Sequence, residues 1–139
     1  MKMKLTALFS VFLFIVCFTM NSVAQDKPEK KPWDVPAKYM SMTNPQAADD
    51  ASMIKLGKMM YAKHCKSCHG NFGKGDGPKA RSIDADLGDF SNAEFQEEKD
   101  GVVYYQSFVG RDDMPNFEKK ITDEEERWAI VTYLRTLKK

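Results

Sequence analysis

One short run of this sequence, Cys65-Lys66-Ser67-Cys68-His69, combines two thiols and an imidazole at a fixed spacing. On a single helical turn, side chains three and four residues apart project from the same face. Two thiols placed in this way can each bond to a vinyl group on one porphyrin edge, while the imidazole behind them binds the iron. This spacing is the attachment motif of c-type haem. It predicts one haem c bonded to Cys65 and Cys68, with His69 as an iron ligand.

Three other kinds of site also use paired cysteines: a plain disulfide, a redox-active dithiol and a zinc site. None of them needs a histidine directly behind the second cysteine. A zinc site needs further ligands, and the chain offers only Cys17 and His64 outside the motif. A redox dithiol normally accompanies a βαβ pattern, which this sequence lacks. We therefore interpret the motif as a haem-attachment site.

A haem iron held by His69 has a second axial position, for which Met114 is the strongest candidate. Met114 precedes Pro115 and follows the charged run 110–113, outside any helical pattern. Proline restricts its own backbone and that of the preceding residue, so it would hold Met114 in a defined loop. The alternatives are the helical methionines, which are better explained as core residues, His64, a lysine, or no ligand at all. His/Met ligation is an established arrangement in haem proteins and guides this choice.

A His69/Met114 pair would determine what the iron can do. The thioether is a soft ligand that favours ferrous iron, so the pair raises the reduction potential compared with two histidines. Two protein ligands also leave no open position for oxygen, peroxide or a substrate. The sequence therefore predicts electron transfer and not an enzyme.

Segments with apolar residues at helical spacing flank both the haem motif and Met114 in the sequence. A first helix, capped by Asp49 or Asp50, is expected to run through Gly57 and Tyr61 into the motif. Further helix starts are predicted at Ser91 with Glu94, at Asp100 before 101–109, and at Thr122 with Glu125. No stretch alternates with a period of two residues. The predicted fold is therefore all-α, with three to five helices wrapped around one covalently attached haem.

The N-terminus has the pattern of a secretory signal peptide. Lys2 and Lys4 precede an apolar run at 5–18, and small residues follow up to Ala24. The expected cleavage after Ala24 would remove residues 1–24. A retained membrane anchor is the weaker alternative, because the run is shorter than the roughly 20 residues that span a bilayer.

Residues 25–48 are rich in proline and lysine and are predicted to form an extended arm or linker. Trp33 and Tyr39 are unusual in a solvated tether. Two interpretations stay open: the arm lies against the domain or a partner, or it is a loosely ordered tail. Residues 49–139 would form one domain. With 21 basic and 20 acidic residues, the chain lacks the charge excess expected of a nucleic-acid-binding protein.

From residue 49 to 139 the sequence resembles class I cytochrome c, in particular the small bacterial monohaem cytochromes. The residues that carry the resemblance are the haem motif with Gly57 and Tyr61 before it and Gly70 after it, then Gly77-Pro78, Gly110, Met114-Pro115, Trp128 and Tyr133. The resemblance implies the cytochrome c fold, in which the first and last helices cross at Gly57 beside Tyr133. It also implies that the Pro78 carbonyl accepts a hydrogen bond from His69 Nδ1 and so supports a ligating imidazole.

Two regions depart from the family pattern: the arm at 25–48 and the charged residues 111–113 before Met114. Arg111 has two interpretations that stay open. It either pairs with a haem propionate, as arginine often does with carboxylates, or it is a loop arginine that is solvated or paired with Asp112 or Asp113.

The resemblance further implies an exported, periplasmic protein, because haem is attached to such cysteines outside the bacterial inner membrane. The leading hypothesis is a monomeric single-electron carrier whose partners are an electron donor and an electron acceptor. It would not bind nucleic acid, and it would contact a membrane only through a partner or an uncleaved signal. The alternative is a fixed subunit of a larger respiratory complex, docked through the N-terminal arm. A haem enzyme or gas sensor ranks last, because no distal His or Arg is clearly placed for peroxide chemistry.

Overall fold

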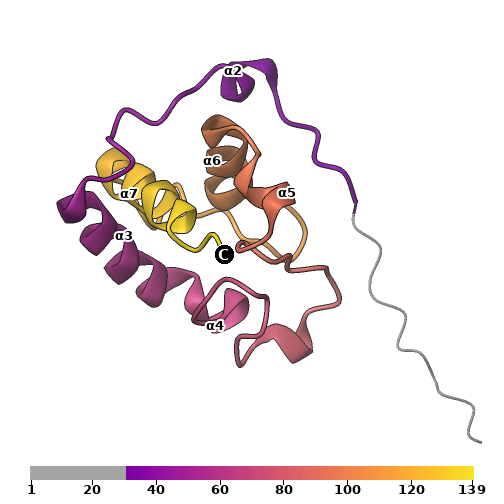
Figure 1. Ribbon diagram of the computed structural model, residues 1–139. Coiled ribbons are helices and arrows are strands. Elements are labelled where there is room, and N and C mark those ends of the chain that lie inside the picture. The colour runs from indigo at the N-terminus through magenta and orange to yellow at the C-terminus, as the bar shows by residue number, and fades with distance from the viewer. Residues whose placement is uncertain (1–30) are drawn as a thin grey trace, which may run out of the picture.

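The computed structural model describes residues 31–139, which form six α-helices and no strand (Figure 1). The helices are α2 (Ala37–Met40), α3 (Ala51–His64), α4 (Lys66–His69), α5 (Ala93–Gln96), α6 (Asp100–Phe108) and α7 (Glu124–Arg135), with a 3₁₀ turn, η1, at Ala80–Ser82. The three longer helices form the frame, and the other three are single turns. The all-α prediction is confirmed. The predicted signal peptide and the first residues of the arm lie outside the described residues.

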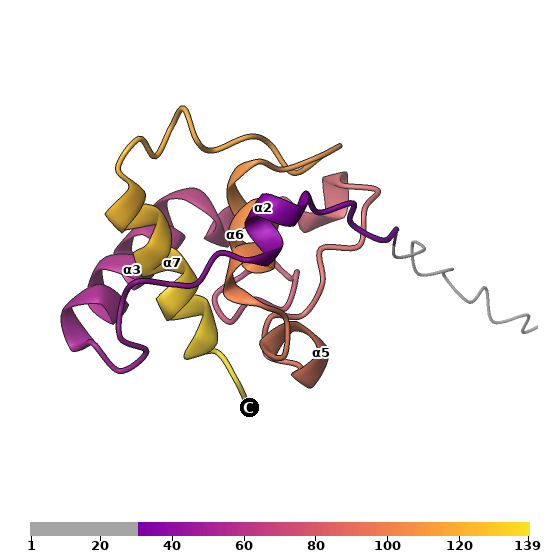
Figure 2. The ribbon, with the colours of Figure 1, turned by 90° about the horizontal axis from the view of Figure 1, so that it is seen from above.

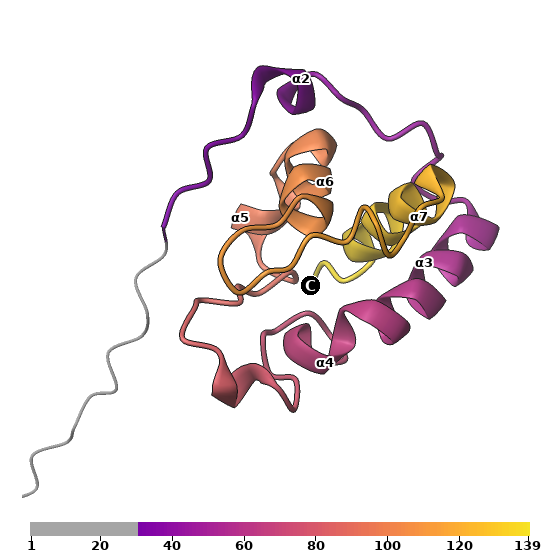
Figure 3. The same ribbon diagram turned by 180° about the vertical axis from the view of Figure 1, so that it is seen from behind.

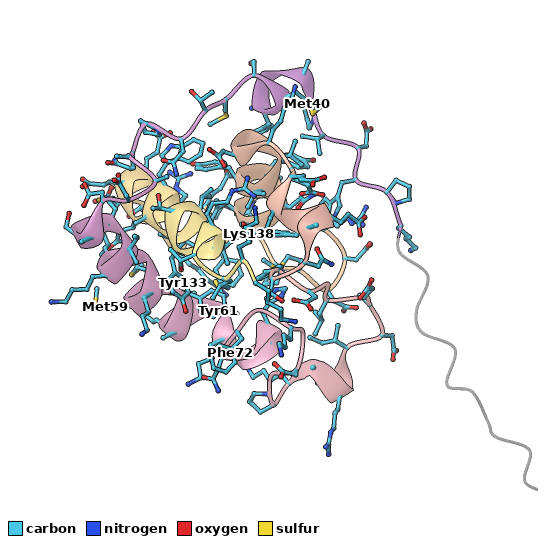
Figure 4. The ribbon with its side chains drawn as sticks, in the orientation of Figure 1. Met40, Met59, Tyr61, Phe72, Tyr133 and Lys138 are labelled. Atoms are coloured by element: carbon cyan, nitrogen blue, oxygen red, sulfur yellow. The ribbon has the colours of Figure 1, made fainter. Side chains whose placement is uncertain are left out.

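Helices α3 and α7 lie side by side and cross at a glycine (Figures 1 and 3). A Cβ added at Gly57 would lie 1.9 Å from the Ala129 carbonyl oxygen and 2.8 Å from the Tyr133 Cβ. Only a residue without a side chain allows this approach. Beyond the crossing, the rings of Tyr61 and Tyr133 lie 5.3 Å apart, and Figure 4 shows both between the two helices. The predicted crossing is confirmed.

Helix α6 packs against α7 and carries the single turn α2 on its outer side (Figure 2). The ring of Tyr104 on α6 lies 4.5 Å from that of Trp128 on α7. Val103 and Phe108 complete the buried face of α6 with exposed fractions of 1% or less. These buried side chains belong to the core cluster, and Tyr105 on the same helix contacts Tyr39 of the arm.

One predicted cap is confirmed, and those of α5, α6 and α7 are each shifted by one residue. Asp50 caps α3, since its Oδ1 accepts hydrogen bonds from the amides of Ser52 and Met53. The cap of α5 is Asn92, not Ser91, and the cap of α7 is Asp123, not Thr122. In both places the Asx side chain accepts a helix amide, as asparagine and aspartate do readily at this position.

Asp100 was predicted to cap α6, but it is the first residue of that helix and binds Arg135 on α7 instead. The Arg135 guanidinium donates to the Asp100 carboxylate from Nε at 3.0 Å and from Nη2 at 2.7 Å. It also donates to the carbonyls of Phe95, Gln96 and Glu98. This one side chain therefore ties the α5–α6 connection to the last helix.

The described part of the arm packs against the domain. Tyr39 is buried in the core cluster, 4.8 Å from the Tyr105 ring of α6. Further along, Asn44 Nδ2 donates to Thr132 Oγ1 of α7 at 2.9 Å. Of the two interpretations left open for the arm, contact with the domain is the one seen for residues 31–48.

Candidate haem-binding site

The motif occupies the junction of α3 and α4. Cys65 ends α3, and its carbonyl accepts hydrogen bonds from the amides of Cys68 and His69 at 3.1 and 3.0 Å. These bonds form one helical turn, which keeps the two thiols and the imidazole at the predicted spacing. Both cysteines are free thiols. The arrangement therefore fits a group that takes two thioether bonds and one nitrogen ligand.

His69 is buried and lacks polar partners. Its side chain is 8% exposed, and burial lowers its pKa to about 4, so the imidazole is neutral. The backbone of Leu87 opposes this shift a little, yet neither ring nitrogen reaches hydrogen-bonding geometry. Buried polar atoms are nearly always satisfied in folded proteins, so an imidazole with two unpartnered nitrogens needs an explanation. A metal ion bound to one nitrogen supplies it, because neutral imidazole is the form that ligates.

The cysteine environment argues against a redox dithiol. Burial, and secondarily the neighbouring Cys68, raises the pKa of the Cys65 thiol to about 12. Reactive thiols of redox enzymes have a lowered pKa, because the thiolate is the nucleophile. A half-buried thiol with a raised pKa fits a residue destined for a thioether bond better than one that cycles between thiol and disulfide.

The predicted hydrogen bond from His69 Nδ1 to the Pro78 carbonyl is not formed in this structure. Backbone bonds hold the residues beside Pro78: the amide of Gly77 donates to the Cys68 carbonyl at 3.0 Å, and that of Lys79 to the Ser67 carbonyl at 2.9 Å. These two bonds hold Pro78 beside the haem motif, but the His69 ring is not bonded to the Pro78 carbonyl. A contact of Pro78 with the haem stays a prediction.

The ring of His69 instead stacks on Phe90, a residue that the sequence analysis missed. The two ring centres lie 4.6 Å apart with an angle of 29°, and Phe95 stacks on the far side of Phe90 at 4.6 Å. Gln96 Nε2 donates to the Phe90 carbonyl at 2.6 Å and fixes this pair. Phe90 lies in a loop outside any periodic pattern, so its only signal was an aromatic residue in a polar stretch.

Loop residues 70–78 are tied back to α3. The Tyr61 hydroxyl donates to the Gly70 carbonyl at 2.7 Å, and the Tyr61 side chain is 2% exposed. Burial raises the pKa of Tyr61, which keeps the hydroxyl protonated and able to donate. In Figure 4, Phe72 of this loop lies beside α4, and it is 65% exposed.

Met114 lies in the loop between α6 and α7, as predicted. The loop begins at Gly110, whose φ of +71° reverses the chain at the end of α6. The Met114 amide then donates to the Arg111 carbonyl at 2.8 Å, and the two residues form an isolated bridge. The Met114 side chain is half-buried and packs against the core cluster. Its role as an iron ligand stays a prediction.

Arg111 binds the N-terminal arm, a contact that the sequence analysis did not predict. Its guanidinium donates from Nη1 to the Pro32 carbonyl and from Nη2 to the Lys31 carbonyl, both at 2.5 Å. It also lies over the ring of Trp33, with Cζ 3.8 Å from the ring centre. A solvated or aspartate-paired Arg111 is therefore wrong for this structure, whereas pairing with a haem propionate stays a prediction. The extended arm offers unpaired carbonyls and an aromatic face together, and a planar guanidinium binds both.

Comparison with known proteins identifies the family. The family described as Cytochrome c matches residues 54–138, which is more than half of the chain. No curated protein matches significantly. Across residues 31–139, no helix has the length and apolar character needed to cross a membrane. The chain belongs to the cytochrome c family, whose members carry electrons with a covalently attached haem c.

Proposed function

We propose that this chain is a single-electron carrier whose one haem c is bonded to Cys65 and Cys68, with His69 and Met114 as axial iron ligands. The observation that carries the proposal is the state of His69. A buried, neutral imidazole without a hydrogen-bond partner lies on the same helical turn as two free thiols. Met114 is the ligand that a defined, proline-bounded loop offers for the opposite axial position.

The haem, when bound, supplies the one-electron chemistry, and the side chains of the chain control it. Helix α4 fixes the direction of His69, and burial keeps its imidazole neutral. The ring of Phe90 covers one face of the His69 ring, and Phe95 stacks on Phe90. An apolar surround and a thioether ligand both favour ferrous iron and so raise the reduction potential. Two axial ligands suit electron transfer and do not suit catalysis.

We further propose that the chain is exported and works in the periplasm. The support is the charged, apolar and small-residue order of residues 1–24. Its partners would then be redox proteins, one donor and one acceptor, in the periplasm or the membrane. In this proposal the chain is a monomer, and it reaches a membrane only through a partner or an uncleaved signal.

An optical spectrum of the protein expressed with its own leader tests the ligands. We expect a c-type spectrum on reduction and, in the oxidised protein, the weak far-red band of a methionine–iron bond. Met114→Ala should abolish this band and lower the reduction potential. Met59→Ala is the matched control, because Met59 is 59% exposed on the outer side of α3 (Figure 4). An unchanged band in Met114→Ala would identify another ligand.

Rapid cyanide or CO binding at neutral pH without ligand displacement would favour an enzyme or sensor.

The alternative of a fixed respiratory subunit needs an arm that is free to dock. Trp33 and Tyr39, the aromatic residues that would serve for docking, have partners on Arg111 and α6 within the chain. We therefore favour the mobile carrier. Co-purification with membrane proteins that depends on residues 25–48 would reverse this preference.

A further inference from the structure

We propose that Arg111 and Trp33 are positioning residues for Met114, and that the N-terminal arm is a strap that holds the methionine loop in place. The strap consists of residues 31–44, and the methionine loop of residues 110–115. This inference rests on the proposed axial role of Met114. It concerns how firmly the loop presents its thioether, which the ligand assignment alone does not specify.

The strap binds the methionine loop through the side chain of Arg111. The Arg111 guanidinium donates to the carbonyls of Lys31 and Pro32 and stacks on the Trp33 ring at 3.8 Å. Two hydrogen bonds and a stacked face together fix both the plane and the position of a guanidinium. Within residues 31–139, these are the side-chain hydrogen bonds that join the methionine loop to a distant segment.

The second step is the anchoring of the strap itself. The Trp33 ring meets the edge of Tyr105 on α6 at 6.2 Å and 84°. Tyr39 is buried, and a Cβ on Gly101 would lie 1.9 Å from the Tyr39 carbonyl oxygen, so the strap lies directly on α6. Asn44 then fastens its far end to Thr132 of α7 at 2.9 Å. Arg111 is therefore held by a segment that is fixed to two rigid helices.

The third step leads from Arg111 to the ligand. The Arg111 carbonyl accepts the Met114 amide at 2.8 Å, so a fixed Arg111 also fixes the backbone of Met114. Asp112, between them, has a φ of +47°, in the left-handed region that is uncommon for residues other than glycine, although aspartate adopts it more often than most. Such a backbone persists only when its surroundings impose it. The Arg111–Met114 backbone bond closes this turn, and the strap holds Arg111 in it.

The consequence concerns the ferric protein. A thioether is a soft ligand and binds ferric iron weakly, so the freedom of its loop competes with the bond. A loop that is already in place loses less conformational entropy when Met114 binds. The strap should therefore protect the methionine–iron bond against competing ligands.

The experiment uses the holoprotein and two readouts. Imidazole is added to the oxidised protein while the far-red methionine–iron band is followed, and hydrogen exchange is measured for the backbone amides of residues 110–114 and 116. Trp33→Ala removes the stacked face and leaves the charge of Arg111 in place. We expect about tenfold less imidazole to displace Met114 in Trp33→Ala, together with faster exchange of the Met114 amide. Trp33→Phe keeps an aromatic face and should restore most of the resistance.

Met40→Ala is the matched control, because Met40 belongs to the same strap and is 43% exposed at its outer surface (Figure 4). It should behave as the unaltered protein in both readouts. An unchanged imidazole titration in Trp33→Ala would overturn the proposal, and so would a changed titration with unchanged exchange of the loop amides. If Met114→Ala keeps the far-red band, the ligand assignment fails. The exchange readout still decides whether the strap orders the loop.

Discussion

The two sides of the candidate haem site are held in different ways. On the His69 side, the imidazole lies on a helical turn whose hydrogen bonds join residues three or four apart. On the Met114 side, the ligand lies in a loop whose order depends on Arg111 and on carbonyls 79 and 80 positions away in the chain. One side is local and the other is assembled from distant segments.

Because of this difference, the attachment of the haem beside His69 and the strength of methionine ligation depend on different parts of the fold. A local helical turn forms together with its helix, so His69 is positioned whenever α3 and α4 are folded. A loop held by a few long-range contacts belongs to the less stable parts of a protein and opens without global unfolding. Damage to the His69 side should therefore lower the stability of the whole fold. Damage to the Met114 side should weaken methionine ligation first.

The largest effect is expected at the helix crossing that supports the His69 side. Gly57→Leu must displace the Ala129 carbonyl, which is backbone and cannot move aside. We expect the free energy of unfolding to fall by about 3 kcal/mol, at the upper end for overpacking. Lys58→Leu places the same side chain at an exposed neighbouring position of α3 and serves as the control in the same denaturant titration.

Gly57→Ala makes this prediction sharper, because helix propensity and packing have opposite signs. In an exposed helix, replacing glycine by alanine stabilises by up to about 1 kcal/mol. At the crossing we expect a loss of stability. A gain would mean that α3 and α7 are not tightly packed at Gly57.

A smaller effect is expected from Gly110→Ala on the Met114 side. The φ of +71° disfavours alanine, and its Cβ would lie 2.3 Å from the Met114 carbonyl oxygen. We expect a loss of about 2 kcal/mol together with a weaker methionine–iron band. Gly88→Ala is the control, because Gly88 has a φ of +69° but no atom within 4 Å of the added Cβ. If both variants keep the band equally well, the contact at Met114 has no influence on ligation.

Local signals in the sequence predicted the fold well and the long-range contacts poorly. The helical pattern around Gly57 and the cap at Asp50 depend on neighbouring residues and were confirmed. The caps at Asn92 and Asp123 were misplaced by one residue, because adjacent polar side chains compete for the same helix amides.

The candidate site shows the same division. The spacing of the haem motif is a local property, and the structure keeps it on one helical turn. The stacking of Phe90 on His69 joins segments that are separate in sequence, and no periodic pattern announces it. The role of Arg111 was missed for the same reason, because its partners lie in an arm whose composition is that of a linker.

The smallest effect tests whether the two sides are independent. Tyr61→Phe removes the hydroxyl that donates to the Gly70 carbonyl and leaves the buried ring in place. We expect the free energy of unfolding to fall by about 1 kcal/mol, the usual net contribution of such a bond, with an unchanged methionine–iron band. Tyr133→Phe is the matched control, because its ring packs on Tyr61 and no hydrogen bond from its hydroxyl is found within residues 31–139. Equal stability of the two variants would show that the Gly70 bond adds nothing. A weakened methionine–iron band in Tyr61→Phe alone would show that the loop behind His69 and the loop that carries Met114 are coupled. The two sides of the site would then not be independent.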